Sequence, residues 1–317
     1  MDGNGINSNA SADRAVSDLG KYGLFDKHGK TGILLIHGVT GAPTEMRHLA
    51  RRLGARGLTV ACPQLAGHCS SLRDLKACSW MDWYRSAELG FDFLRTQCDK
   101  VFVAGLSMGA LLALKLAAER PDEIDGVATM SATFFYDGWN VPRLKQRFLL
   151  PIVMHSPLRY FMSYREPSPY GIKDERLRNV VAMVYGSGTG RNNLAEKYGY
   201  SEFPGVTIRE SFDLIRNVKK NLPKVVAPTL ILHATEDDMA SVENARFLAG
   251  RIGSRRIESC YFDDTYHVLT MDRRKDDVAD RIGRFVECCE VGAEAEFGDA
   301  AGEWTHSVEL SRTGSMP

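Results

Sequence analysis

A serine lies at the centre of a glycine-flanked motif in the first half of the chain. Ser107 is the third residue of Gly-Leu-Ser-Met-Gly (residues 105–109), which follows the apolar run Val101–Ala104 and precedes a helix-like stretch, residues 110–119. A strand, a sharp turn and a helix in this order are typical of a nucleophile elbow, where glycines leave room for a strained serine backbone and an incoming carbonyl group. The motif therefore predicts that Ser107 is a nucleophile.

A histidine further along the chain is needed to accept the serine proton, because a hydroxyl group alone is a poor nucleophile. In chains with this elbow the sequence order is serine, acid, histidine. His155 lies in an inserted segment, His306 lies in a polar tail, and His233 would precede the acid. His267 lies in a short polar loop after the run Ile257–Phe262, at the end of a strand where α/β sheets collect their chemistry. We predict that His267 is the general base.

An acidic cluster follows the apolar run Thr229–Leu232. It contains Glu236, Asp237 and Asp238. One of these carboxylates is predicted to orient the base, and spacing alone does not choose among them. The other two are expected to cap the helix that begins near Ser241. A metal site built from these carboxylates is disfavoured, because no histidine follows at ligand spacing.

Two backbone amides are candidates for stabilising the oxyanion that forms on the substrate. The elbow supplies the N–H of Met108, the residue after the nucleophile. The apolar run Ile33–Ile36 ends in a glycine-flanked loop, residues 37–41, so the N–H of Val39 is the second candidate. His37 is interpreted as a loop-shaping residue whose imidazole hydrogen-bonds nearby backbone, with no direct catalytic part.

Short apolar runs that alternate with helical stretches must position these residues. The predicted strands are Ile33–Ile36, Leu58–Cys62, Val101–Ala104, Gly126–Met130, Thr229–Leu232 and Ile257–Phe262. Between the first two, apolar residues recur at helical spacing from Met46 to Leu53, and a last helix is expected at residues 276–289. This alternation predicts an α/β fold with a mostly parallel central sheet flanked by helices.

A long insertion separates Met130 from Thr229, because 98 residues intervene where a crossover connection needs little more than a dozen. We interpret this insertion as a helical cap over the active site. Four of its apolar residues are predicted to line the substrate pocket: Phe148, Leu150, Met154 and Phe161. The alternatives are an ordinary cap core without substrate contact and, less favoured, docking on a membrane surface.

The predicted organisation has four parts. They are a flexible N-terminal arm (1–30), the α/β core (31–133 and 229–289), the cap (134–228) and a flexible C-terminal tail (290–317).

Composition excludes several classes of function. The 317 residues contain 40 Lys and Arg against 40 Asp and Glu, so no excess charge favours nucleic acid or an anionic membrane as a partner. The polar N-terminus does not resemble a secretory signal, and no apolar run is long enough to span a bilayer, so a cytoplasmic location is expected. The seven cysteines lack Cys-x-x-Cys spacing and are expected to be reduced, without a zinc site.

These residues together resemble the α/β-hydrolase superfamily, and within it the bacterial carboxylesterase and monoacylglycerol lipase branch. The similar segments are 34–43 (Leu-Leu-Ile-His-Gly-Val-Thr-Gly-Ala-Pro), 63–68 (Pro-Gln-Leu-Ala-Gly-His), 82–83 (Asp-Trp), 105–109, 234–239 (Ala-Thr-Glu-Asp-Asp-Met) and 267–272 (His-Val-Leu-Thr-Met-Asp). The resemblance covers roughly residues 31–289 apart from the cap and implies an α/β-hydrolase fold. In its register the acid of the triad is Asp237.

The sequence therefore predicts a serine hydrolase that cleaves small carboxylic esters through an acyl-enzyme on Ser107, without a cofactor or a metal. The alternatives are a thioesterase, an amidase or an acyltransferase with the same triad, and less favoured, a non-catalytic ligand-binding protein on the same fold. The oligomeric state is left open.

Overall fold

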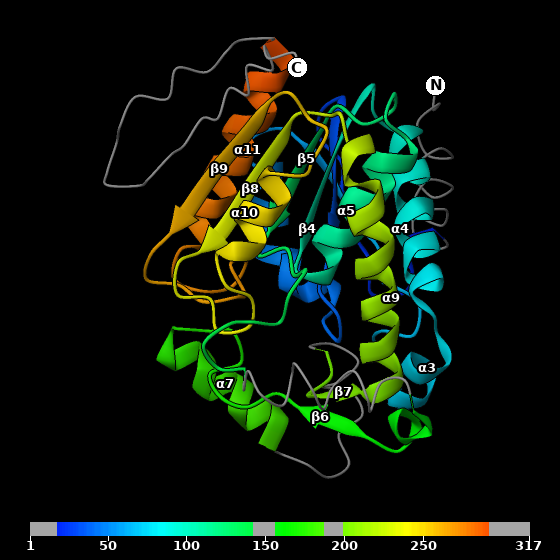
Figure 1. Ribbon diagram of the computed structural model, residues 1–317. Coiled ribbons are helices and arrows are strands. Elements are labelled where there is room, and N and C mark those ends of the chain that lie inside the picture. The colour runs from blue at the N-terminus through cyan, green and yellow to red at the C-terminus, as the bar shows by residue number, and fades with distance from the viewer. Residues whose placement is uncertain (1–17, 142–155, 187–198, 292–317) are drawn as a thin grey trace, which may run out of the picture.

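A seven-stranded sheet forms the centre of the computed structural model, which describes residues 18–141, 156–186 and 199–291 (Figure 1). Its strands, in spatial order, are β1 (Leu24–Asp26), β3 (Thr59–Cys62), β2 (Thr31–Ile36), β4 (Lys100–Leu106), β5 (Gly126–Met130), β8 (Thr229–Ala234) and β9 (Ile257–Phe262). Every neighbouring pair is parallel except β1 with β3. The mostly parallel sheet and all six predicted strands are confirmed.

The central strands are apolar and buried, as expected for parallel strands covered on both faces. The register pairs Leu35 with Ala104 and Ile36 with Gly105, so β2 and β4 end side by side. Because parallel strands share one direction, their carboxyl ends meet at one edge of the sheet, and the loops that follow β2, β4, β8 and β9 gather there.

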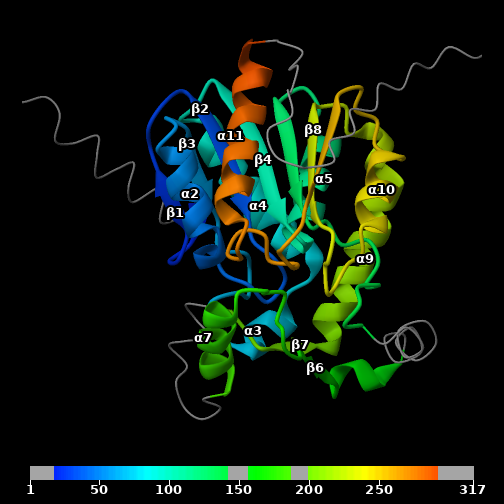
Figure 2. The same ribbon diagram turned by 90° about the vertical axis from the view of Figure 1, so that its left-hand side faces the viewer.

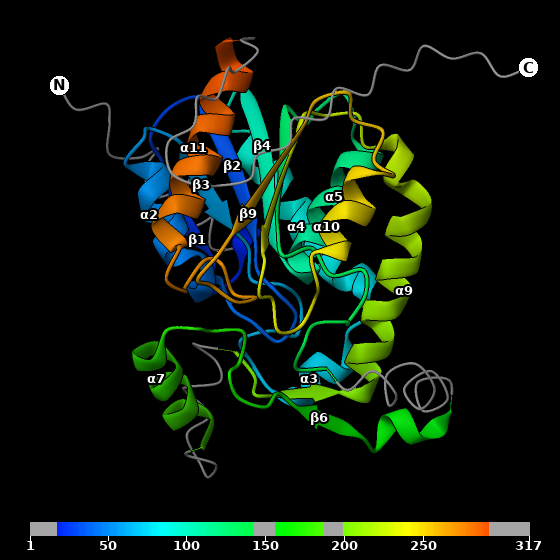
Figure 3. The ribbon, with the colours of Figure 1, turned by 60° about the vertical axis from the view of Figure 1, so that its left-hand side comes forward.

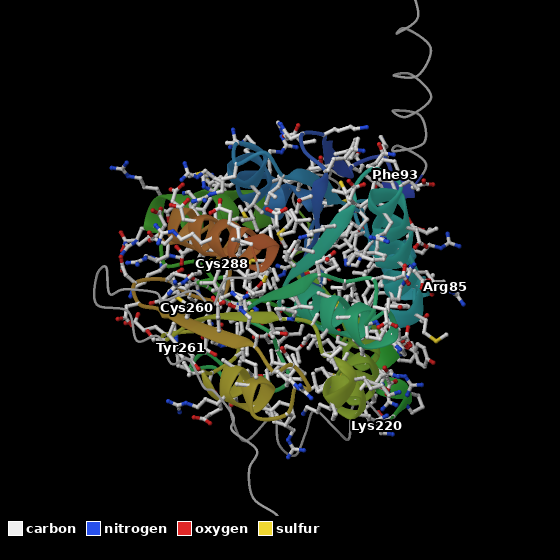
Figure 4. The ribbon with its side chains drawn as sticks, turned by 90° about the horizontal axis from the view of Figure 1, so that it is seen from above. Arg85, Phe93, Lys220, Cys260, Tyr261 and Cys288 are labelled. Carbon is white, nitrogen blue, oxygen red and sulfur yellow. The ribbon has the colours of Figure 1, made fainter. Side chains whose placement is uncertain are left out.

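Helices cover the two faces of the sheet. One face carries α2 (Arg47–Gly54) and α11 (Lys275–Val291), which lie together in front of the sheet in Figure 2. The other face carries α4 (Trp80–Arg95), α5 (Met108–Glu119), α9 (Gly205–Asn221) and α10 (Glu243–Ala249). Consecutive residues of β9 face opposite layers: Cys260 belongs to the apolar cluster of α11, and Tyr261 packs against the cluster on the other face (Figure 4).

The start of the described chain differs from the predicted arm, which was expected to run to residue 30. Leu19 is buried, and β1 pairs with β3 through Leu24–Cys62 and Phe25–Ala61. Part of the predicted arm, residues 24–26, is therefore an edge strand of the sheet. The sequence signal was too short to predict it, because β1 has three residues and is defined by a partner far along the chain.

Part of the insertion lies beyond the carboxyl ends of the strands, below the sheet in Figure 3. Its described elements are a 3-10 turn (Pro157–Tyr160), β6 (Ser163–Arg165), α7 (Glu175–Gly186) and β7 (Glu202–Pro204), with β6 and β7 forming a two-stranded sheet, and α3 (Leu72–Ala77) of the core lies nearby. The last helix within the range 134–228, α9, packs back along α5. The described insertion thus has one part beyond the sheet and one part within the core layers.

Within the described ranges, every helix is too short or too polar to cross a membrane. None of the seven cysteines forms a disulfide.

Candidate active site

Ser107 lies in a strained turn between β4 and α5. Its backbone has φ 55° and ψ −113°, and its N–H donates to Met130 O at 2.8 Å. The flanking glycines are required by space, because a Cβ at Gly105 would lie 2.1 Å from the Gly109 carbonyl oxygen. A Cβ at Gly109 would lie 2.1 Å from the oxygen of Ile36. At the predicted elbow, the backbones of β4, α5 and β2 therefore lie in close contact.

Three predicted side chains from distant segments form one hydrogen-bonded row. His267 Nε2 lies 2.9 Å from Ser107 Oγ, and His267 Nδ1 lies 2.9 and 2.8 Å from the two carboxylate oxygens of Asp237. The exposed fractions are 9% for Ser107 and 3% each for His267 and Asp237, so the row is shielded from water. This is the geometry in which an imidazole can take the serine proton while a carboxylate holds its ring.

His267 and Asp237 each stabilise the charged form of the other. Burial disfavours the charged form of His267, but the ion pair and hydrogen bond with Asp237 outweigh it and raise the pKa of the imidazole to about 9. Burial also opposes ionisation of Asp237, yet His267 holds the pKa of that carboxyl below its usual value. Asp237 also accepts from the backbone N–H groups of Met239 and Ala240 at 2.9 and 2.8 Å. It is therefore held as an oriented anion.

Thr133, which the sequence did not single out, lies beside Ser107. Its hydroxyl oxygen lies 3.2 Å from Ser107 Oγ and 3.1 Å from the backbone oxygen of Ser131, to which it donates. It follows β5, the strand beside β4, so the sheet order brings it to the serine. No local motif marks it.

The acidic cluster divides into three roles. Asp237 faces His267, as the family register predicted, and Asp238 Oδ2 instead accepts from the backbone N–H of Gly171 in the insertion at 3.1 Å. Glu236 pairs with Lys173 of the insertion. The expectation that the two remaining acids cap the next helix is wrong.

That helix, α10, begins at Glu243. The backbone N–H of Ser241, just before the helix, is bound by Asp137. Ser241 N donates to Asp137 Oδ1 at 2.9 Å, and Asn244 Nδ2 donates to the same oxygen at 3.0 Å. The acid near the start of α10 thus comes from a segment far away in sequence.

One predicted oxyanion donor lies in the elbow and the other in a separate loop. Met108 is the first residue of α5, and Val39 lies in the loop after β2. In the described part of the chain, neither backbone N–H donates a hydrogen bond to another protein group. Both remain available to an oxygen of a substrate. The carboxylate of Glu45 supports this loop by accepting from Gly38 N at 3.4 Å.

Two further buried histidines contact backbone oxygens. His37 Nδ1 donates to Gly38 O at 2.9 Å, and its Nε2 accepts from Leu65 N at 3.4 Å. Burial and the neighbouring His68 lower the pKa of His37 to about 3, so its ring is neutral. His233 is buried at the end of β8 and contacts Ala240 O at 2.8 Å.

Three of the predicted pocket residues, Phe148, Leu150 and Met154, lie outside the described residues. The fourth, Phe161, follows the 3-10 turn of the insertion with 87% of its surface exposed. It does not pack against the serine in this structure, and the pocket stays a prediction.

Asp272 connects the insertion to the loop that carries His267. Its carboxylate accepts from Tyr266 N at 2.8 Å and from Thr265 Oγ1 at 3.0 Å within that loop. It also accepts from the backbone N–H groups of Lys173 and Asp174, both at 2.9 Å. One buried carboxylate thus binds both segments. No local pattern predicts this role, because two of the four donors lie about a hundred residues away in the chain.

In the described segments, no three His, Cys, Asp or Glu side chains come together in a way that could hold a metal ion.

Comparison with known proteins identifies the class. Residues 27–274 match the family model described as serine aminopeptidase, S33. The chain is 29% identical over 249 residues to the thermostable monoacylglycerol lipase of Bacillus sp. (strain H-257), covering 78% of this chain and 87% of the relative. It is 25% identical over 262 residues to the carboxylesterase of Bacillus subtilis (strain 168), covering 82% of this chain and 94% of the relative.

A solved structure from work on LipS and LipT, two metagenome-derived lipolytic enzymes, has a TM-score of 0.70 and 25% identity, covering 84% of this chain and 96% of that chain. Fold and site together define an α/β-hydrolase, which confirms the predicted fold class. Within that class, the chain belongs to the serine aminopeptidase, S33 family. The resemblance to the carboxylesterase and monoacylglycerol lipase branch is confirmed by its relatives.

Proposed function

We propose that this protein hydrolyses small carboxylic esters, with Ser107 as nucleophile, His267 as general base and Asp237 as the residue that orients His267. The observation that carries the proposal is the continuous row from Ser107 Oγ through both ring nitrogens of His267 to Asp237. A buried row of this kind activates a hydroxyl group that would otherwise be unreactive at neutral pH.

The reaction proceeds in two stages. His267 Nε2 takes the proton of Ser107 as Oγ attacks the ester carbonyl carbon, and the N–H groups of Met108 and Val39 stabilise the negative oxygen. His267 then returns the proton to the departing alcohol, which leaves an acyl group on Ser107. In the second stage water gives a proton to His267 and attacks the acyl carbon, and Ser107 leaves with that proton as the acid is released.

The substrate class is inferred from the relatives together with the site. Two curated relatives are named as a monoacylglycerol lipase and a carboxylesterase, so the proposed substrate is a small ester of glycerol or of another simple alcohol. The predicted apolar pocket and the cytoplasmic location are part of this proposal.

The description of the matching family favours a second candidate, hydrolysis of an amide bond. Both reactions form the same acyl-enzyme and differ in the leaving group, which is an alcohol in one case and an amine in the other. A panel of p-nitrophenyl esters, thioesters and aminoacyl anilides with matched acyl groups separates them. We expect the highest kcat/KM on the esters, and a higher value on the anilides would replace the first candidate by the second.

The test of the nucleophile is covalent labelling. A fluorophosphonate probe is expected to label the wild-type protein at Ser107. The variant Ser107→Ala is expected to remain folded and unlabelled and to lose ester turnover by at least about a thousandfold. Labelling at another residue, or substantial turnover by the folded variant, would reject the assignment and favour a ligand-binding protein or another nucleophile.

A further inference from the structure

A cavity of about 490 Å³ lies where α2, α7 and α11 begin. Figures 2 and 3 show α7 next to the lower ends of α2 and α11. Four of its lining side chains are cations from these helices: Arg47 and Arg51 of α2, Arg176 of α7 and Lys275 of α11. The triad residues do not line this cavity.

The four cations lack ion-pair partners in the part of the chain that the structure describes. Arg47 and Arg51 stand four residues apart on one helix, a spacing at which like charges repel. Arg47, Arg176 and Lys275 also lie in the first turns of their helices, where the helix dipole disfavours positive charge. This arrangement costs free energy unless an anion is present.

Two acids, Asp174 and Glu45, line the cavity with the four cations, and Asp276 follows Lys275 in the chain. Asp276 pairs with His48 at 3.1 Å, and Asp174 accepts from Leu177 N at 2.9 Å at the start of α7. Glu45, which also lines the cavity, has its pKa raised by burial to about 7. The cavity therefore has a net positive charge near neutral pH.

A buried hydroxyl group in the cavity wall lacks a partner. Thr270 is 1% exposed, and its Oγ1 forms no hydrogen bond with any of the described residues. Leaving a buried hydroxyl unsatisfied costs about 1–3 kcal/mol. An acceptor supplied by a ligand would remove this cost, so Thr270 is an observation independent of the cations that points to the same cavity.

The remaining wall includes apolar side chains. Leu177, Val180 and Met271 line the cavity, and Val180 is 55% exposed. A ligand that matches this surface has an oxyanion for the cations and Thr270 and an apolar body for these residues.

We propose that this cavity binds a small organic oxyanion, a phosphate monoester or a carboxylate joined to an apolar chain or ring, at a site separate from the serine. Arg47, Arg51, Arg176 and Lys275 attract the anion, and Thr270 donates a hydrogen bond to one of its oxygens. The site does not depend on the proposed hydrolysis.

Calorimetric titration with phenyl phosphate, and in parallel with phenylacetate, tests the site and separates the two kinds of anion. Phenol serves as the uncharged control. We expect saturable binding of at least one anion at one site, weakened by added salt, and no binding of phenol. Absence of saturable binding by both anions, or equal binding of phenol, would overturn the proposal.

Matched variants locate the binding. Arg51→Gln is expected to raise the Kd about tenfold or more, because a charge-assisted hydrogen bond is worth about 1.5–3 kcal/mol. Arg284→Gln is the control, since Arg284 is an exposed arginine of α11 outside the cavity. If both variants raised the Kd of the anion equally, the protein would attract the anion non-specifically, and the site would be rejected. Unchanged Tm and p-nitrophenyl ester turnover confirm that the variants are folded.

Thr270→Val gives a sharper readout. In the ligand-free protein its Tm is expected to stay the same or rise, because the lost hydroxyl group has no partner. Its Kd for the bound anion is expected to rise about threefold to tenfold. A lower Tm with an unchanged Kd would show that the hydroxyl group serves the fold and would remove Thr270 from the site.

Discussion

At the residue scale, two adjacent aspartates of one loop have different hydrogen-bond partners and different expected roles. Asp237 holds the ring of His267, while Asp238 accepts from Gly171 N. Asp237→Asn is expected to lower kcat by about four orders of magnitude, because an amide stabilises the wrong tautomer of the histidine. Asp238→Asn is expected to lower kcat less than about tenfold, because its amide oxygen can still accept from Gly171. Steady-state kinetics of the two variants decides, and reversed effects would mean that the acid has been misassigned.

The charge state of His267 sets the response to pH. The imidazole accepts a proton only when neutral, so activity must rise as the pH passes upward through its pKa. Since Asp237 raises that pKa above 6.5, the acidic limb of kcat/KM is expected to have its midpoint between pH 6.5 and about 9. Residual activity of Asp237→Asn should have its limb at lower pH. A wild-type midpoint below 6.5 would contradict the ion pair.

At the element scale, the insertion and the His267 loop are bound to one carboxylate. Asp272 accepts four hydrogen bonds, two from each segment. Asp272→Ala leaves these donors unsatisfied and is expected to cost about 2–4 kcal/mol, which lowers Tm by about 5–15 °C and also reduces kcat. Calorimetry and kinetics measure both effects. Asp122→Ala, at an exposed acid, is the control, and equal losses in the two variants would refute this role for Asp272.

The sequence predicted those elements whose signals are local. The elbow around Ser107 combines an apolar run, two glycines and a helical stretch within twenty residues, and all of these are visible in the chain. Asp272 and Thr133 lack such signals, because their partners come from other strands or from the insertion. Spacing alone could not choose Asp237 over Asp238 for a similar reason, since the difference lies in what each faces across the fold.

At the scale of the whole molecule, the insertion is not independent of the core. Leu214 of α9 is fully buried in the apolar cluster that α4 and α5 form against the sheet. The sequence analysis assigned α9 to the cap, because the next predicted strand after Met130 begins only at Thr229. The distinction between cap and core is made by packing, which the order of residues does not show.

Leu214→Ala is therefore expected to lower the free energy of unfolding of the whole core by about 2–5 kcal/mol. Leu158→Ala, at a leucine of the insertion that is 55% exposed, should change it by less than about 0.5 kcal/mol. Urea denaturation followed by circular dichroism measures both variants. If Leu214→Ala produced a separate early transition and left the main one in place, α9 would belong to an independent cap.

The shared carboxylate of Asp272 has a consequence for protein engineering. A chimaera that exchanged the insertion for that of another hydrolase would replace the segment that contains Lys173 and Asp174. Here the transplanted segment would have to present two consecutive peptide N–H groups where Lys173 and Asp174 now present theirs. An insertion chosen for pocket shape alone would remove two of the four hydrogen bonds that hold the Asp272 carboxylate. His267 would then be displaced, and the chimaera would lose activity whatever its new specificity.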